Sequence, residues 1–341
     1  MKKLKIAVIM HPALIPPDSR EGISEKIADT WKTEFDVVST LRDLGHDVRP
    51  VGIYDDLKPV RELIAEWEPD LIFNLLEEFL GSAEFDFHVV TYLEMKQVPF
   101  TGCRPRGLII ARDKALAKKI LHYHRIRVPH FAVFPRRRSV RRPRELKFPL
   151  IVKSLTEEAS AGISQASIVY DDEKLRERVA FVHESVGTDA LVEEFIEGRE
   201  LYVCILGNKA LTVLPIWELV FENLPPGASA IATARVKHSS EYQRKRGIFQ
   251  QPAEDLPEGL TRQIVHTSKR IYKLLGLDGY ARLDFRLQEN GDFYFLEANP
   301  NPEIASTEEF ASAAEAAGID YPALLQKIVN LGLQRARGAS V

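Results

Sequence analysis

The sequence of 341 residues lacks the features of several protein classes. Its two cysteines, Cys103 and Cys204, are too few for a disulfide framework or a Cys-rich zinc site. No apolar run approaches the roughly 20 residues that a membrane helix needs. The apolar run after the N-terminal lysines stops at His11, which predicts a first strand and not a signal peptide. We therefore expect a cytoplasmic protein in a reducing setting, with no membrane partner.

The chain also lacks an excess of charge. Its 46 Lys and Arg residues nearly balance 49 Asp and Glu residues, and the net charge of -3 gives no global field that would attract nucleic acid. One basic segment, Arg136 to Arg144, could bind nucleic-acid phosphates, but it has no interleaved aromatic residues. We interpret it as a solvated loop and expect no nucleic-acid partner.

A glycine-rich turn is missing after the first predicted strand. The segment at 11–17, HPALIPP, contains no glycine that would let a pyrophosphate approach the backbone. An NAD or FAD site is therefore not expected there.

The length and an apolar content of 45% predict two or three packed subdomains. Strand and helix patterns alternate up to about residue 101, which predicts a parallel sheet. Short strands and helices follow, and then longer strands with C-terminal helices. We predict an N-terminal α/β substrate domain at 1–103, a small α+β lid at 104–188 and a C-terminal antiparallel-sheet catalytic subdomain at 189–341.

The individual elements follow from the periodicity of apolar residues. The expected strands span residues 4–10, 46–53, 70–75, 131–134, 150–154, 166–170, 190–196, 200–206, 211–217, 280–287 and 293–299. The expected helices span residues 24–44, 57–67, 85–96, 113–124, 172–184, 259–275, 305–317 and 322–335.

Polar residues follow the predicted strands of the first domain. Ligands collect outside the carboxyl ends of the strands of a parallel sheet, which makes His11, Asn74, Glu77 and Glu78 candidates for a substrate wall. Each of them alone is equally well explained as a solvated loop residue.

The clearest chemical pattern is a predicted hairpin near the C-terminus. The strand period of two puts Arg282 and Asp284 on one face, and the returning strand puts Glu297 and Asn299 on one face. Carboxylate and amide oxygens are the ligands that Mg²⁺ prefers, so Asp284, Glu297 and Asn299 are candidate metal ligands. For the hairpin alone, pairing of the two carboxylates with arginines on a solvated face would be the stronger interpretation.

The residues that follow change this preference. The segment Glu297 to Pro302, EANPNP, is followed by Ser306 to Ala311, STEEFA. Here the sequence closely resembles the ATP-grasp superfamily, and within it the D-alanine–D-alanine ligase-like branch, from about Pro99 to Leu331. The resemblance implies the ATP-grasp architecture, with ATP between the sheet of the lid and the sheet of the C-terminal domain.

The resemblance also implies which residues contact the phosphates of ATP. Lys114, at the start of a helix, and Lys153, at the end of a strand, match the family's phosphate-binding lysines. Ser160 and Gly162 lie in the loop that closes over the phosphates, and Lys237 matches a lysine on a mobile loop that contacts the terminal phosphate. Without the resemblance, Lys114 would be a helix residue in water.

A further segment resembles the adenosine site. Its residues are Glu193, Glu194, Phe195, Ile196 and Glu200. The resemblance places the first acidic residue at the adenine amino group, the backbone near Phe195 and Ile196 at the ring edge, and Glu200 at the ribose hydroxyls. The pattern alone would indicate an edge strand with solvated carboxylates.

The implied reaction joins a carboxylate to an amine. It proceeds through an acylphosphate and releases ADP and phosphate, with two Mg²⁺ ions, for which Mn²⁺ can substitute, and with Arg282 and Lys237 as catalytic groups. The partners are then ATP and small-molecule or peptide carboxylates and amines, and a homodimer is compatible with the resemblance. The alternatives are a true D-alanine–D-alanine ligase, another ATP-grasp reaction such as phosphotransfer or carboxylation, and a non-catalytic ATP-binding protein.

Two departures from the ligases concern the substrates. The acidic residue that holds the first amino acid has no counterpart in residues 15–20, and Glu303 and Glu308 stand near positions where the ligases have a glycine and a serine. An anionic wall would repel a carboxylate and favour a cationic or carboxylate-free amine. We therefore hypothesise that the acceptor is not free D-alanine.

Overall fold

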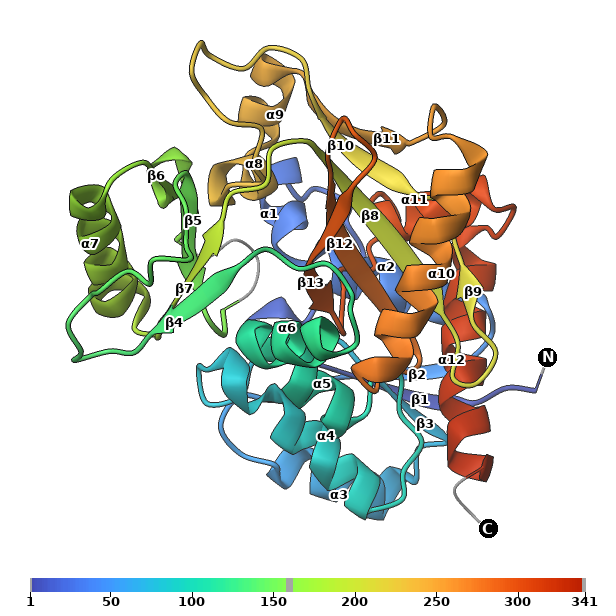
Figure 1. The fold of residues 1–341 in the computed structure, drawn as a ribbon. Coiled ribbons are helices and arrows are strands. Elements are labelled where there is room, and N and C mark those ends of the chain that lie inside the picture. The colour runs from blue at the N-terminus through green and yellow to red at the C-terminus, as the bar shows by residue number, and fades with distance from the viewer. Residues whose placement is uncertain (1, 158–161, 339–341) are drawn as a thin grey trace.

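The computed structural model describes residues 2–157 and 162–338, which form three sheets (Figure 1). A three-stranded parallel sheet has the order β2-β1-β3, a four-stranded antiparallel sheet has the order β4-β7-β5-β6, and a larger antiparallel sheet has the order β11-β10-β8-β12-β13 with β9 beside β8. Figure 1 shows the first sheet at the bottom, the second at the left in green and the third at the upper right. This succession of one parallel and two antiparallel sheets is the predicted architecture.

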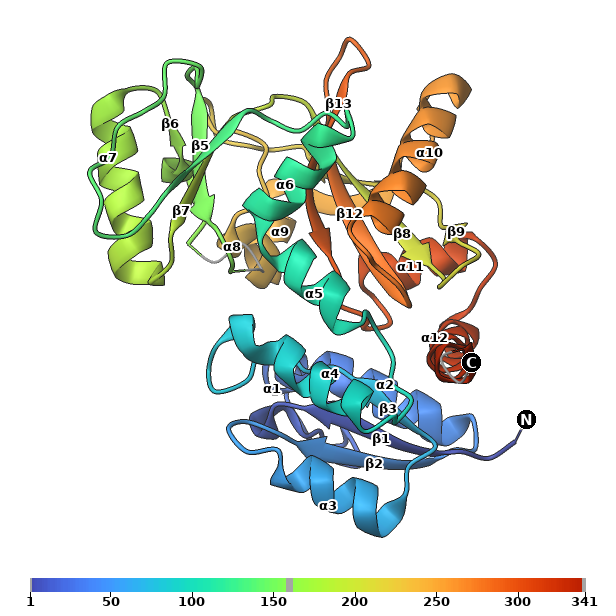
Figure 2. The same ribbon diagram turned by 60° about the horizontal axis from the view of Figure 1, so that its bottom comes forward.

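The N-terminal domain packs helices on its parallel sheet (Figure 2). Strands β1 and β3 are almost wholly buried apolar runs, as is usual for a parallel sheet, whereas β2 at the edge contains polar residues and is only partly buried. The strands are β1 (Lys5–Met10), β2 (Asp47–Gly52) and β3 (Leu71–Asn74), and the helices are α1 (Glu25–Ala28), α2 (Lys32–Asp43), α3 (Lys58–Trp67) and α4 (Asp86–Met95). The predicted helix at 24–44 is thus divided by a short 3-10 turn, Asp29–Trp31.

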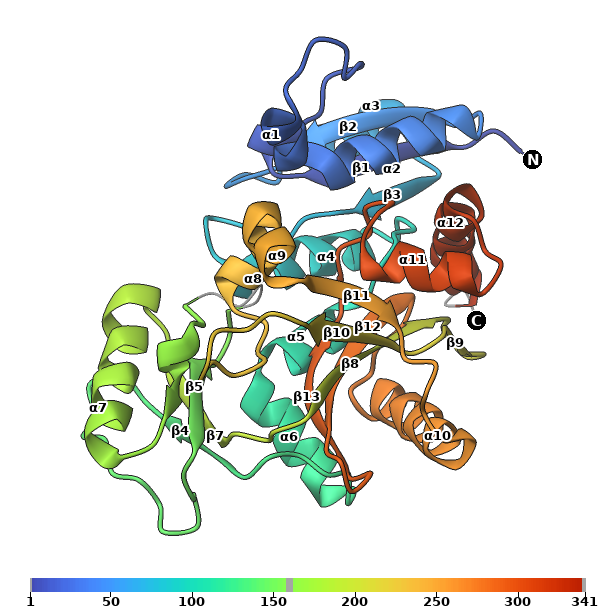
Figure 3. The same ribbon diagram turned by 90° about the horizontal axis from the view of Figure 1, so that it is seen from above.

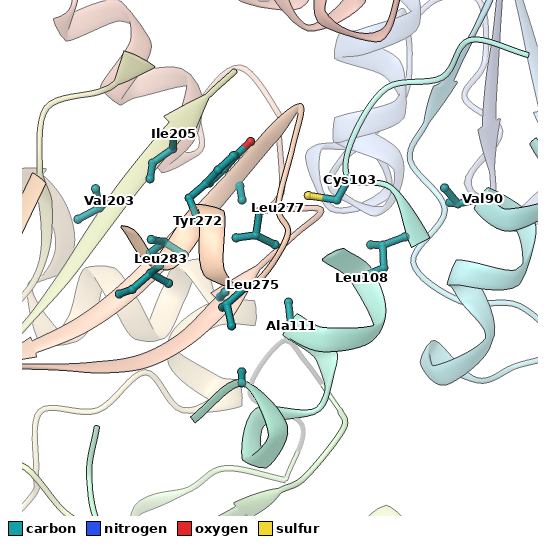
Figure 4. Close-up of a cluster of buried hydrophobic side chains, with 14 of the residues drawn as sticks. Val90, Cys103, Leu108, Ala111, Val203, Ile205, Tyr272, Leu275, Leu277 and Leu283 are labelled. Atoms are coloured by element: carbon teal, nitrogen blue, oxygen red, sulfur yellow. The ribbon is translucent and has the colours of Figure 1, made fainter. Parts of the chain in front are cut away.

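Two helices connect this domain to the rest of the chain. They are α5 (Pro105–Arg112), which we did not predict, and α6 (Lys114–Tyr123), which begins where the Asp113 carboxylate accepts a hydrogen bond of 2.8 Å from the Leu116 N–H. Leu108 and Ala111 of α5 lie in one core with Leu275 and Leu283 of the C-terminal domain (Figure 4). These helices therefore pack on the C-terminal sheet, although the range predicted for the lid, 104–188, included both of them.

The four-stranded sheet forms a body at the side of the molecule (Figure 3). Its elements are β4 (Phe131–Phe134), β5 (Leu150–Ser154), β6 (Ile168–Val169), α7 (Asp172–Phe181), the π-helical turn Val182–Val186 and β7 (Ala190–Glu194). Both edges of β7 are paired, with β4 and β5, so the lid sheet extends beyond residue 188, where we predicted that it ends.

The C-terminal sheet contains the predicted hairpin. Its strands are β8 (Arg199–Leu206), β9 (Thr212–Val213), β10 (Trp217–Phe221), β11 (Ile248–Pro252), β12 (Tyr280–Leu287) and β13 (Phe293–Asn299), and its helices are α8 (Ala234–His238), α9 (Ser240–Arg246), α10 (Glu258–Leu274), α11 (Glu309–Ala316) and α12 (Tyr321–Gly338). The predicted strand at 211–217 is wrong, because Pro215, which has no N–H for the ladder, separates β9 from β10. No helix in the described ranges has both the length and the apolarity to span a bilayer.

The hairpin divides an apolar face from a polar face, as predicted. Leu283 and Phe285 are completely buried in the main core, and the Phe285 ring makes edge contacts with Phe293 and Phe295 at centroid distances of 5.9 and 6.0 Å. Asp284 points to the other face. The packing of Phe285 thus fixes the hairpin that carries the polar groups.

We predict that Phe285→Ala lowers the free energy of unfolding by about 3–5 kcal/mol, because it leaves a cavity beneath the hairpin. The measurement is denaturant unfolding followed by tryptophan fluorescence. As a control, Tyr123→Ala, at a side chain that is 82% exposed, should change the value by no more than about 0.5 kcal/mol. A loss for Phe285→Ala no larger than that of the control would contradict this account of the hairpin.

Candidate active site

Two carboxylates and an amide meet across the hairpin. Asp284 lies opposite Glu297 and Arg282 opposite Asn299, with a bulge after Asp284 that brings Phe295 opposite Phe285. Bulges next to active sites often redirect side chains. The Asn299 Nδ2 donates a hydrogen bond of 3.1 Å to Asp284, which leaves the Asn299 Oδ1 without a partner among the described residues. The three predicted metal ligands are therefore brought together.

Arg282 holds Asp284 in place. Its Nε and Nη2 donate to the two carboxylate oxygens at 2.8 and 3.0 Å, and its Nη1 donates to Glu309. Burial opposes the charge of Arg282, but Asp284 outweighs burial and raises the pKa of the guanidinium further. The pairing with arginine that we kept as an alternative is thus present. It is buried, with Asp284 only 3% exposed, and not on a solvated face.

Lysines of the lid and of α6 face this polar group. The Lys114 Nζ lies 3.8 Å from the Glu297 carboxylate and donates to the Glu157 carbonyl at 2.6 Å. Burial would raise the pKa of Glu297, but Lys114, Lys153 and Lys237 outweigh it and lower the pKa to about 2. Glu297 is therefore ionised at neutral pH.

Glu193 lies between two buried lysines. Its carboxylate oxygens are 2.9 Å from the Lys118 Nζ and 3.0 Å from the Lys153 Nζ. Burial alone would raise its pKa, but the two lysines together hold the pKa of Glu193 below its usual value. Glu193 was predicted at the adenine amino group; the structure shows it as the partner of both lysines.

The residues after Glu193 line an apolar region between the sheets. Phe195 and Ile163 pack against the buried side chains of Ile151, Ile168 and Ile231. Glu194 and Ile196 are partly exposed beside them. An apolar slot with a few polar groups is a typical adenine site, so the arrangement fits the role that the resemblance implied for this segment.

Glu200 lies on the polar face of the C-terminal sheet. It accepts hydrogen bonds from Arg286 at 2.8 Å and from the Tyr202 hydroxyl at 3.1 Å. The two partners fix the carboxylate, and each of its oxygens keeps acceptor capacity for a ligand hydroxyl.

The remaining predicted phosphate contacts are only partly described. Ser160 lies outside the described residues. Gly162 has a φ of +69°, and a Cβ there would come within 2.8 Å of Val186, so no other residue fits without rearrangement. Lys237 lies in α8, and its charge lowers the pKa of Glu297.

The candidates in the N-terminal domain have different surroundings. Asn74 is buried and accepts a hydrogen bond of 3.1 Å from the Leu76 N–H, so its amide shapes the end of β3. Glu78 lies 3.7 Å from His11, and burial raises the pKa of Tyr280, to which the charge of Glu77 adds. The carboxyl end of β3 therefore lies near the hairpin.

Glu303 and Glu308 contact the start of α2. Glu303 accepts a hydrogen bond of 3.2 Å from the Thr33 hydroxyl, and Glu308 lies 3.1 Å from the Lys32 Nζ. The segment after the metal-ligand candidate Asn299 is thus attached to the N-terminal domain.

Our sequence analysis missed two buried partners of the site. Lys118 could have been found, because it follows Lys114 by one helical turn and so shares its face. Glu309, the partner of Arg282, has no local signal, because its role depends on a contact 27 residues away.

The donor set fits Mg²⁺. Hard oxygen atoms from two carboxylates and one amide suit this ion, which also keeps waters and substrate phosphates as ligands. The described ranges contain no group of three or more His, Cys, Asp or Glu side chains that is arranged to hold a metal ion by itself. The two carboxylates of the candidate site would therefore need the Asn299 amide and the oxygens of a nucleotide as further ligands.

Comparisons with known proteins agree with this geometry. The model of the family described as D-ala D-ala ligase C-terminus matches residues 120–330. The D-alanine–D-alanine ligase of Carboxydothermus hydrogenoformans is 31% identical over 92% of this chain and 96% of its own, and that of Pelotomaculum thermopropionicum is 31% identical over 81% and 84%. The chain belongs to the D-alanine–D-alanine ligase family.

A solved structure supports the fold. The D-alanine–D-alanine ligase of Bacillus anthracis in complex with ATP superposes with a TM-score of 0.75 at 24% identity, over 99% of this chain and 100% of that one. The predicted ATP-grasp fold is thus confirmed. As a member of the family, the protein is an ATP-dependent ligase that joins a carboxylate to an amine, and ATP and Mg²⁺ are the cofactors of the family.

The lowered pKa of Glu297 predicts a pH dependence of stability. In the absence of Mg²⁺, the stabilising contribution of the ionised carboxylate is fully present above its unfolded-state pKa of 4.5 and is lost as the pH falls towards the folded-state pKa of about 2. The stability difference between the wild type and Glu297→Gln should therefore be constant from pH 7 to pH 5 and should shrink below that.

Denaturant midpoints at several pH values measure this difference. Glu289→Gln, an exposed position on the turn of the same hairpin, is the control and should show no such trend. A difference for Glu297→Gln that stays unchanged down to pH 3 would contradict the assignment.

Proposed function

We propose that this ligase activates a substrate carboxylate as an acylphosphate and then forms an amide. A carboxylate oxygen attacks the γ-phosphorus of ATP, and the bond to the bridging oxygen breaks, releasing ADP. The amine nitrogen then attacks the acyl carbon, the bond to phosphate breaks, and the amine loses a proton. The observation that supports this chemistry best is the convergence of Asp284, Glu297 and Asn299 opposite Lys114 and Lys153.

The metal-ion part of the proposal rests on the hairpin. Asp284, Glu297 and Asn299 would hold two Mg²⁺ ions, and Mn²⁺ would be able to substitute. Bound ions would neutralise the oxygens of the transferring phosphoryl group. Arg282 keeps Asp284 fixed for this role through two hydrogen bonds.

The remaining roles belong to cations and to the apolar slot. We assign Lys114, Lys153 and Lys237 to the phosphates, the slot at Phe195 to adenine and Glu200 to the ribose. An arginine has five N–H groups, and Arg282 uses three of them in its contacts with Asp284 and Glu309. The two that remain can stabilise the negative charge of the acylphosphate and of the tetrahedral intermediate.

The proposal also covers the cellular compartment and the oligomeric state. We propose a cytoplasmic enzyme, since both cysteines are free thiols and buried, and a homodimer remains compatible. We do not extend the D-alanine of the relatives' names to this chain, because Glu303 and Glu308 place negative charge in the segment that follows Asn299.

The proposal predicts that Asp284→Ala lowers the rate of ADP release by about 1,000-fold or more, because it removes a metal ligand worth several kcal/mol. Glu289→Ala, on the exposed turn of the same hairpin, should keep the wild-type rate. The measurement is coupled ADP release across a panel of carboxylates and amines, with mass spectrometry of the products. ADP release by Asp284→Ala at the wild-type rate would refute the assignment of the site.

A further inference from the structure

Arg286 is a buried cation that the proposed chemistry does not use. It follows Asp284 by two residues on β12, so both side chains lie on the polar face of the C-terminal sheet. Arg286 is only 5% exposed. Because burial of a charged group is costly unless partners compensate for it, the partners of Arg286 indicate what it does.

One partner is Glu200 on the neighbouring strand. Strands β8 and β12 lie side by side (Figure 1), and Glu200 is directly opposite Arg286 in their antiparallel register. The Arg286 Nη2 donates a hydrogen bond of 2.8 Å to the Glu200 Oε2, while the Oε1 accepts one from the Tyr202 hydroxyl. A hydrogen bond between two charged groups is strong and directional. Arg286 thus sets the orientation of the carboxylate that we assigned to the ribose.

Backbone carbonyl groups anchor the guanidinium itself. The Arg286 Nη1 donates hydrogen bonds to the carbonyl oxygens of Gly198 and Ala230 at 3.0 and 2.9 Å. Gly198 directly precedes β8, whereas Ala230 belongs to residues 229–231 between β10 and α8, which we call the strap. The planar guanidinium presents its donors in a rigid fork, so the two carbonyl groups fix the direction in which it reaches Glu200.

The strap places this arrangement beside the slot that we assigned to adenine. Ile231 is buried in the same apolar cluster as Phe195. Ser229 is bonded to Gln165 of the lid, because its N–H donates to the Gln165 Oε1 and its carbonyl oxygen accepts from the Nε2, each at 2.9 Å. Arg286 is therefore bonded both to the wall of the adenine slot and to the proposed ribose acceptor.

We propose that Arg286 is a positioning residue for the ribose of ATP, which holds the Glu200 carboxylate in the orientation that accepts the ribose hydroxyls. This inference rests on the proposed assignment of Glu200 to the ribose and adds the group that makes Glu200 effective. Arg286 acts through Glu200 and not by touching the nucleotide. Without Arg286, the carboxylate loses its anchored partner and turns away from the ribose.

Equilibrium binding tests the inference without turnover. The probes are ADP and 2′,3′-dideoxy-ADP, which differ only in the two ribose hydroxyls. Each is titrated calorimetrically into the protein in the presence of Mg²⁺. The wild type should bind ADP at least about tenfold more tightly than the dideoxy compound, because a site that is built to bond hydroxyls rejects an analogue without them. We call this ratio of affinities the hydroxyl preference.

Two substitutions at Arg286 locate the effect. Arg286→Met keeps the length of the side chain but removes its charge, and it should reduce the hydroxyl preference to about twofold or less. Arg286→Lys should keep a preference of about threefold, because an ammonium still pairs with Glu200 but lacks the anchoring fork. As a control, Arg262→Met removes an exposed arginine from α10 and should leave the preference at the wild-type value.

A double-mutant cycle tests whether Arg286 acts through Glu200. Glu200→Gln should abolish most of the hydroxyl preference, and Arg286→Met added to it should lower the preference no further. A preference that either Arg286 variant leaves at the wild-type value would overturn the positioning role. Equal weakening of both nucleotides would overturn it too, because a purely structural role does not depend on the hydroxyls. If a thermal melt shows that Arg286→Met is unfolded, Arg286→Lys carries the test.

The outcomes separate this inference from the function on which it rests. If the wild type has no hydroxyl preference, the assignment of Glu200 to the ribose fails and this inference fails with it. A preference that depends on Glu200 but not on Arg286 refutes this inference alone. If the preference depends on both residues, but no pair of carboxylate and amine supports ADP release, then the positioning role stands and the amide-forming function is refuted.

Discussion

The site depends on opposite charges that are held in a largely buried space between two sheets. Lys153 comes from the lid, Lys114 and Lys118 from α6, and Glu193 and Glu297 from different sheets. Removing one partner of a buried pair usually destabilises a protein by about 3–5 kcal/mol, so these groups constrain one another. The constraint keeps the lysines in position without a ligand, and a triphosphate could then replace internal contacts with its own oxygens.

The hairpin β12–β13 connects this charge arrangement to the rest of the fold. Phe285 fixes its apolar face in the main core. Its polar face carries Asp284, with Glu297 opposite it and Asn299 two residues further along the same strand as Glu297. Arg282 joins the hairpin to α11 through Glu309, and the segment after Asn299 is attached to α2. Groups from all three subdomains therefore meet near one set of oxygen ligands, and substrate binding can be coupled to the position of the lid.

Local patterns in the sequence were enough for much of this arrangement. The alternation of side chains along residues 280–287 correctly separated the faces of β12, and Asn290-Gly291 marked its turn. The pairing of strands that are distant in the sequence could not be deduced in the same way. The pattern of β7 is compatible with either antiparallel sheet, and only its hydrogen bonds to β4 and β5 place it in the lid. The burial of Glu34 was missed because one glutamate on an amphipathic helix gives no signal that the rest of the fold will cover it.

The central claim is that the oxygen acquired by the released phosphate comes from the substrate carboxylate. Positional isotope transfer tests it most directly. A carboxylate found active in the ADP-release screen is labelled with ¹⁸O in both oxygens, and the products are analysed by mass spectrometry. The account predicts that each inorganic phosphate carries one ¹⁸O and that the amide retains the other. Phosphate without label, formed together with ADP, would show that water or another group accepts the phosphoryl group, and would contradict the account.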